Sequence, residues 1–336
     1  METKALSQFL PQAGRGHSVD SAVRTQLVQS LDSLYARVQS FINYDKGALS
    51  VMLKAINRGP IRPAVFGAYT DLVESIGVND ASVAQRLSDR LLNLQVSSPG
   101  TRVVTLVDRD LGPDQTQRYA RLINDDPEEH VCMLPVAEID QANAAVTEAL
   151  SLIEAAAPAL AEEIKGLIRE IVVVEPAISP KTGESIRFDG ASTFYLWGAL
   201  FVNIAGKSRI ELAQTFAHET GHLLLFGLMM GRPMVENAYD ERYESPLRQD
   251  PRPMEGLVHA AYVLARMDYC LASLSLSGAL TTEERKMALS EMERHHDRFH
   301  IAMDTIRQNA RFTPAGAAIF DGAIEYMKKK TDLLQA

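Results

Sequence analysis

The segment from Ser208 to Pro233 constrains the fold more than any other part of this sequence. It opens with a serine that is followed three residues later by Glu211, which is the pattern of a capping box. Apolar residues then recur at helical spacing, and Gly231 and Pro233 form a stop signal. The sequence therefore predicts one helix with TFAHETGHLLLFG near its centre.

Two histidines lie four residues apart in this helix. His218 and His222 point from the same helical face, and Glu219 directly follows the first. The H-E-x-x-H pattern is typical of two imidazoles that hold one metal ion. The alternative is a buried helix with two satisfied histidines, but it needs partners that a metal supplies directly. Gly221 costs about 1 kcal/mol relative to alanine, which predicts a close approach to the backbone there.

Composition narrows the class of protein. The 336 residues are 46% hydrophobic and can bury a large core, and a net charge of -9 without a basic run argues against nucleic acid as a partner. No apolar signal region stands at the N-terminus, and the run HLLLFGLMM is too short to cross a bilayer. Only Cys132 and Cys270 are present, too few for a disulfide framework or a thiolate cage. We expect a cytoplasmic protein that binds neither membranes nor nucleic acid and whose metal ligands are nitrogen and oxygen; homo-oligomer formation stays open.

Hydrophobic periodicity predicts an α+β fold that is mostly helical. Helices are expected to begin at Asp20, Lys46 and Ala81. We predict that residues 1–98 form a helical N-terminal cap or subdomain and that residues 99–336 form a metal-binding catalytic domain.

Short β-branched runs predict a small mixed sheet. Residues 102–108 and 171–176 should form neighbouring strands, separated by an Ala-rich helix that Pro158 interrupts. A third strand is expected over residues 194–204, immediately before the H-E-x-x-H helix. Further helices should follow that helix to the end of the sequence.

The third strand has two interpretations. Together with the H-E-x-x-H helix it resembles zinc-peptidase-like folds, in which an edge strand packs beside the zincin-type helix and pairs with an extended peptide. Gly198 in the middle of this strand is compatible with such close backbone approach. A plain core strand explains the same residues, and the sequence leaves both interpretations open.

The metal needs a third protein ligand. The extended motif H-E-x-x-H-x-x-G-x-x-H is excluded, because Leu225 and Leu228 occupy the positions of its glycine and last histidine. A later helix offers Glu255 and His259 on one face. We favour His259, because imidazole suits zinc and iron while a neighbouring glutamate can orient it; Glu255 is the alternative ligand.

Two other groups of candidate ligands are better explained as solvated surface. The first is the acidic stretch between the two helices, with Glu236, Asp240, Glu241 and Glu244. The second is a charged helix with His295, His296 and His300.

The loop YESPLRQDPRPMEG contains three prolines that stiffen it just before the helix of the third ligand. Arg248 and Arg252 would thereby be held near the metal, where a guanidinium can bind a carboxylate ligand in a bidentate manner. Arg252 is favoured, because it lies closer to the ligand helix. The alternative is that each arginine pairs with a neighbouring carboxylate such as Asp250 or Glu244.

The segments HETGHLLLFG and ERYESPLRQDPRPMEGLVHAAYVLARM resemble the H-E-x-x-H peptide-modification proteins found beside ribosomally synthesised, post-translationally modified peptides. The resemblance covers residues 194–267 and is loose elsewhere. That family is understood to include iron(II)- and 2-oxoglutarate-dependent enzymes that hydroxylate the β-carbon of residues in a precursor peptide. The resemblance implies that His218, His222 and His259 bind the metal and that an arginine of the proline-rich loop holds the 2-oxoglutarate carboxylate.

Three functions compete for these residues. The first is an iron(II)/2-oxoglutarate-dependent oxygenase that hydroxylates a precursor peptide, although an all-histidine triad departs from the usual set of two histidines and one carboxylate. The second is a zinc-dependent peptidase or hydrolase with Glu219 as general base. The third is a non-catalytic peptide-binding protein with a degenerate metal site. We favour the oxygenase.

Overall fold

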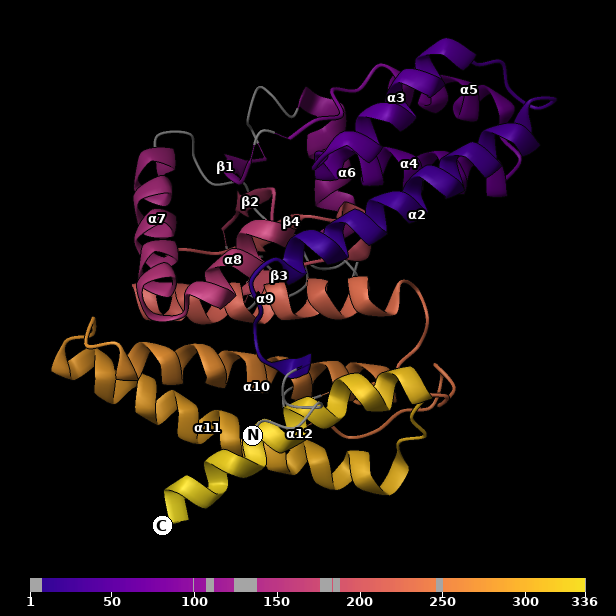
Figure 1. Ribbon diagram of the computed structural model, residues 1–336. Helices are drawn as coiled ribbons and strands as arrows, with labels where there is room; N and C mark the ends of the chain where they lie inside the picture. Colours follow the sequence, from indigo (N-terminus) through magenta and orange to yellow (C-terminus); the bar gives the residue numbers. More distant parts are fainter. Residues whose placement is uncertain are drawn as a thin grey trace. The chain divides into compact units, whose positions relative to one another are not determined.

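The computed structural model describes residues 8–98, 100–106, 112–123, 138–175, 183, 188–245 and 250–335 (Figure 1). The chain divides into two compact units. Unit 1 comprises Met1–Arg15, Val146–Ile164 and Lys207–Ala336, and unit 2 comprises Gly16–Ala145 and Lys165–Gly206. The predicted boundary at residue 98 does not coincide with this division, because the N-terminal helices share a unit with the strands.

Helices form the first part of unit 2. They are α2 (Arg15–Val38), α3 (Lys46–Arg58), α4 (Pro63–Gly77), α5 (Ala81–Leu92) and α6 (Gly112–Ile123). The sequence predicts α3 and α5 at their observed starts, and α2 begins five residues before the predicted Asp20. Side chains of Asp45 and Asp80 cap α3 and α5 by accepting hydrogen bonds from backbone N–H groups of the first turn.

The sheet of unit 2 has the strand order β1-β2-β4-β3. Its strands are β1 (Arg102–Thr105), β2 (Glu170–Val173), β3 (Gly190–Ala191) and β4 (Ala199–Val202). The pairs β1–β2 and β2–β4 are parallel, whereas β3 pairs antiparallel with β4. Every residue of β2 and β4 is buried, as expected for inner parallel strands. The predicted α+β class, mostly helical with a small mixed sheet, is confirmed.

Of the two interpretations of the strand before the H-E-x-x-H helix, the edge strand is wrong. β4 lies between β2 and β3, so the core-strand interpretation holds. Residues Phe194–Leu196, predicted as strand, form a short 3-10 helix. Gly198 has a φ of 89°, and a Cβ added there would stand 3.1 Å from Cγ of Arg169 and 3.3 Å from the carbonyl oxygen of Leu167. The glycine therefore serves a left-handed turn against the chain's own backbone.

Unit 1 contains the long C-terminal helices. These are α9 (Arg209–Met229), α10 (Met254–Leu276), α11 (Thr282–Asn309) and α12 (Pro314–Gln335), and α7 (Ile139–Ala156) and α8 (Pro158–Leu167) cross the division between the units. The break between α7 and α8 falls at Pro158, as predicted. α10 packs against α9, α11 and α12 (Figure 1). Among the helices that the structure describes, none combines the length and apolar character needed to cross a bilayer.

A buried ion pair joins three distant segments of unit 1. The side chains of Arg266 on α10 and Glu163 on α8 are in contact and fully buried. Arg266 also donates to the carbonyl oxygen of Phe9 at 3.0 Å, and Arg15 donates to Glu163 at 2.7 Å. The ring of Phe9 packs edge-on against Tyr262, with ring centroids 5.5 Å apart. Each charged group in this cluster has a partner, which offsets the cost of removing it from water.

Candidate metal centre

Local signals place the histidines in the middle of α9. The Ser208 hydroxyl accepts from the backbone N–H of Glu211, whose carboxylate accepts from the backbone N–H of Ser208. This is the predicted capping box. The helix ends at Met229, and the left-handed residues Met230 and Gly231 follow, as expected for a stop signal.

The imidazoles of His218 and His222 face each other. Their Nε2 atoms are 3.2 Å apart, and their ring planes are inclined by 73°. Two nitrogens that each lie about 2.1 Å from one metal ion are about 3.4 Å apart at a tetrahedral angle and about 3.0 Å apart at a right angle. The observed separation lies between these values, so the pair fits one cation. The same separation suits a hydrogen bond between two neutral imidazoles.

The environment of His222 favours its neutral form. Burial lowers the pKa of His222 well below its ordinary value, and the imidazoles of His218 and His259 lower it further. Neutral imidazole is the form that binds metal ions, so this position offers a ligand without first losing a proton.

His259, the favoured third ligand, lies beside the pair on α10. Its ring centroid is 5.7 Å from that of His222, and the two rings are nearly parallel, at 20°. Nearly parallel stacked rings do not aim their in-plane nitrogens at one point, and Nε2 of His259 is 3.4 Å from Oε1 of Glu255. Consistent with this, no group of three or more His, Cys, Asp or Glu side chains in the described ranges is arranged to hold a metal ion. His259 as a ligand stays a prediction.

Glu255, the alternative ligand, is occupied by other contacts. Its carboxylate accepts from the backbone N–H groups of Met234 at 3.0 Å and Val235 at 3.2 Å. Burial raises the pKa of Glu255, but the hydrogen bonds from His259 and Met234 outweigh burial and lower it. An ionised carboxylate beside an imidazole is the arrangement that orients histidine ligands in metal sites. These contacts favour a role for Glu255 in orienting His259.

Glu219 lies next to the nitrogen that would bind a metal. It is 3% exposed, and its Oε1 is 3.8 Å from Nε2 of His218. A carboxylate in this position can contact a water molecule held at the pair, which is what a general base requires.

The predicted close approach at Gly221 is confirmed. A Cβ added there would stand 3.1 Å from Cγ1 of Val263 and 3.5 Å from Cγ of Arg266. The approaching groups are side chains of α10. Gly221 therefore allows α9 and α10 to pack closely in the segment where His222 faces His259.

Arg252, the favoured arginine of the proline-rich loop, pairs with a neighbouring carboxylate. Arg248 lies outside the described residues. Nε of Arg252 is 2.8 Å from Oδ2 of Asp250, the pairing that was the alternative to ligand binding. The backbone of Arg252 is fixed by two hydrogen bonds with Tyr243, at 2.9 and 2.8 Å. Because both partners of the ion pair are exposed, the pair contributes at most about 1 kcal/mol, and another carboxylate can replace Asp250.

Most of the acidic residues between α9 and α10 are exposed, as predicted. Glu236, Asp240 and Glu244 are exposed, as predicted. Glu241 is half-buried and accepts hydrogen bonds from Tyr243, Arg311 and Asn237. These hold the pKa of Glu241 at about 2.

The prediction fails for one histidine of α11. His295 is 1% exposed and belongs to the buried face of the helix, whereas His296 and His300 are half-buried. Consecutive helical residues point about 100° apart, so His295 and His296 face different surroundings.

Sequence reasoning missed Gln214. It lies one turn before His218 on α9, and its Oε1 is buried without a hydrogen-bond partner among the residues that the structure describes. A bound molecule with an N–H group would satisfy this oxygen. The sequence signal that could have identified Gln214 is its spacing of four residues from His218, which places both side chains on one face of the helix.

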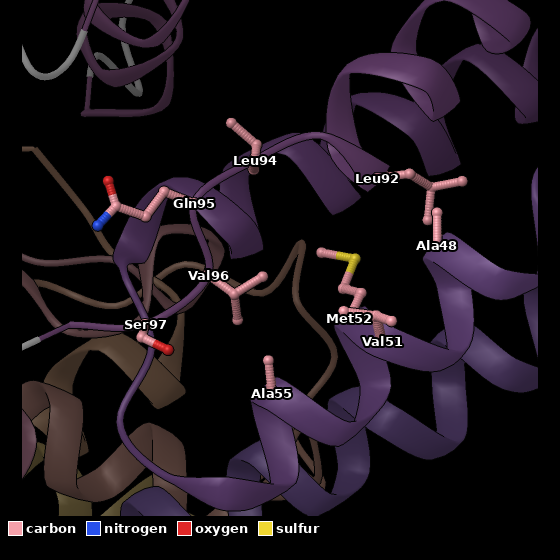
Figure 2. Close-up of a pocket in the computed structure, with 9 residues that line it drawn as sticks. All are labelled: Ala48, Val51, Met52, Ala55, Leu92, Leu94, Gln95, Val96 and Ser97. Atoms are coloured by element: carbon pink, nitrogen blue, oxygen red, sulfur yellow. The ribbon is translucent and has the colours of Figure 1, made fainter.

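Unit 2 contains a separate apolar pocket between α3 and the segment after α5 (Figure 2). Its lining residues are Ala48, Val51, Met52, Ala55, Leu92, Leu94, Gln95, Val96 and Ser97. None of them is titratable, so this pocket offers shape and apolar surface but no acid, base or metal ligand.

No family model matches the chain, and no curated protein matches its sequence. The resemblance to the H-E-x-x-H peptide-modification proteins therefore stays a prediction. The inference of function rests on the residues of α9, α10 and the loop between them.

Proposed function

We propose that the chain is an iron(II)- and 2-oxoglutarate-dependent oxygenase that hydroxylates a residue of a ribosomally made precursor peptide. The observation that carries the proposal is the pair of His218 and His222, whose Nε2 atoms lie 3.2 Å apart. With His259 turned toward the metal as a third ligand, three imidazoles would leave positions open for both chelating oxygens of 2-oxoglutarate and for dioxygen. With iron and 2-oxoglutarate bound, the centre would convert 2-oxoglutarate and O₂ to succinate and CO₂ while one oxygen atom enters a C–H bond of the peptide.

Other residues of the chain support this centre. Glu255, anchored to two backbone N–H groups, would hold His259 through one ring nitrogen and leave the other for the metal. Arg252 already lies against a carboxylate, that of Asp250, and would exchange it for a carboxylate of 2-oxoglutarate. In this role Glu219 neighbours the metal and is not needed as a base.

A second candidate function is zinc-dependent peptide hydrolysis. The specific observation in its favour is the position of Glu219, whose Oε1 lies 3.8 Å from Nε2 of His218. Zinc lowers the pKa of its bound water, and a carboxylate in this position can accept the proton.

One reconstitution experiment separates the two functions. The full chain is loaded anaerobically with iron(II), and 2-oxoglutarate is added while the visible spectrum is recorded. We expect a weak charge-transfer band that bleaches with oxygen and yields succinate. His222→Asn should abolish the band, whereas the matched substitution His300→Asn on α11 should leave it unchanged.

Glu219→Gln provides the second comparison. The oxygenase should keep the band and succinate formation in this variant. Absence of the band in the wild type, together with peptide cleavage by the zinc-loaded chain that Glu219→Gln abolishes, would replace the oxygenase with the hydrolase.

A further inference from the structure

A second imidazole pair lies on α11. His296 and His300 are four residues apart, and an acidic residue, Asp297, directly follows the first. Their Nε2 atoms are 3.1 Å apart, and their ring planes are inclined by 64°. The corresponding values for the pair on α9 are 3.2 Å and 73°. The two helices thus present closely similar pairs of nitrogen atoms.

The surroundings of the α11 pair are those of an accessible surface site. Both histidines are half-buried, and Asp297 and Asp304 on the same side of the helix are exposed. The charges that act on His300 come from His296, Arg307, Asp304 and Asp297. Arg307 is itself 3.9 Å from Asp304, so this carboxylate offsets part of its positive charge. A cation at the pair would meet two carboxylates and one guanidinium that is already neutralised in part.

A core residue on the buried face of α11 contacts one histidine of the pair. Phe299 is 2% exposed, and its ring stands edge-on to that of His300, with centroids 6.0 Å apart. His300 is therefore held at one side by a core residue, and less side-chain freedom is lost when a metal binds.

The donor set selects the class of ion. Imidazole nitrogens suit late first-row transition metals, whose affinities rise toward copper, whereas magnesium and calcium need cages of oxygen atoms. Two imidazoles at this separation can occupy two neighbouring positions of one ion, and water can fill the rest.

We propose that His296 and His300 form a second, surface-exposed site for Cu²⁺, Ni²⁺ or Zn²⁺, with two protein ligands and water. The site does not depend on the proposed oxygenase function or on metal binding at α9. With two protein nitrogens and water as its ligands, the site should exchange its metal more readily than a centre held by three protein ligands. Metal content measured on the purified protein would then report two different sites.

The test isolates the α11 pair. Untagged full-length chain with His218→Asn and His222→Asn is titrated with Ni²⁺ in a calorimeter, and the titration is repeated with Cu²⁺. We expect one binding event per chain, tighter for Cu²⁺ than for Ni²⁺. Adding His300→Asn should weaken that event at least roughly 10- to 100-fold, because even the loss of a group that only orients a ligand costs this much.

Two further measurements make the result decisive. Electron paramagnetic resonance of the Cu²⁺ complex should show two coupled nitrogens in the α9-substituted chain and one after His296→Asn. Far-UV circular dichroism should show unchanged helix content, because both histidines are partly exposed. A titration that shows no event, or an event that survives both α11 substitutions with unchanged affinity, would overturn the proposal whatever the α9 centre does.

Discussion

Gly221→Ala tests the close packing that brings the candidate ligands together. The new methyl group would stand 3.1 Å from Cγ1 of Val263 and within 3.7 Å of two carbons of Arg266. Both neighbours are fully buried, so neither side chain can swing into solvent. The helices must therefore separate slightly, in the segment where His222 faces His259.

Two opposing effects set the size of the change. Alanine in place of glycine inside a helix contributes about 1 kcal/mol, whereas overpacking a core costs about 1–3 kcal/mol. We expect the free energy of unfolding to fall by up to about 2 kcal/mol, the difference between these two effects. Gly256→Ala on α10 is the matched control, because its Cβ would meet only Cβ of Arg252, at an ordinary 3.8 Å. That variant should be stabilised by up to about 1 kcal/mol.

The assay is urea denaturation followed by far-UV circular dichroism, with Ni²⁺ affinity measured on the same variants in the His300→Asn background. Val263→Ala removes the contact, so the double variant should recover part of the loss and show a coupling energy in a mutant cycle. Equal stabilisation by Gly221→Ala and Gly256→Ala, with no coupling to Val263→Ala, would show that the two helices are not in tight contact here.

Three other predictions have defined outcomes. His218→Ala and His222→Ala should each abolish metal binding at α9 while Glu219→Gln retains the metal, as measured by Fe²⁺ binding in the His300→Asn background; loss of metal from the Gln variant would contradict this. Glu163→Gln should lower the free energy of unfolding by about 3–5 kcal/mol, because the buried guanidinium of Arg266 loses its counter-charge. Urea denaturation measures this loss, and a loss below that range would argue against a buried ion pair. An arginine hydrogen bond holds the pKa of Glu284 at about 2, below its ordinary 4.5. Its contribution to stability is therefore present above pH 4.5 and lost as the pH falls toward 2; Glu284→Gln should flatten this decline in acid denaturation, and an unchanged pH profile would refute it.

Features of local origin were predictable from the sequence. The capping box at Ser208 and Glu211 fixes the start of α9, and the helical repeat then determines that His218 and His222 share a face. Pro158 lacks an N–H group, so it breaks the α7–α8 helix at the expected place. The β-branched runs that form β1 and β2 are likewise read directly from residue type.

Features that depend on distant pairing were not predictable. β4 looked equally suited to the edge or the interior, because the partner that covers its second side is the two-residue strand Gly190–Ala191, too short to leave a periodic signal. His259 lies beside Glu255, whose carboxylate accepts hydrogen bonds from the backbone of Met234 and Val235, 21 and 20 residues earlier in the chain. Burial of His295 follows from tertiary packing of α11, although its spacing from the buried Phe299 hints at it.

The discontinuous makeup of unit 1 affects the order in which the protein can fold as it is synthesised. Phe9 lies in a core whose other members come from residues 225–327, and its backbone hydrogen-bond partner Arg266 follows 257 residues later. At roughly 5–20 residues per second, the ribosome needs about 13–50 s to add that stretch. All residues of unit 2 have been added once residue 206 is in place, so this unit can fold first. The side chain of Phe9 is still exposed to solvent at that stage. Newly made chains should therefore be open to chaperone binding at this segment until α10 leaves the ribosome.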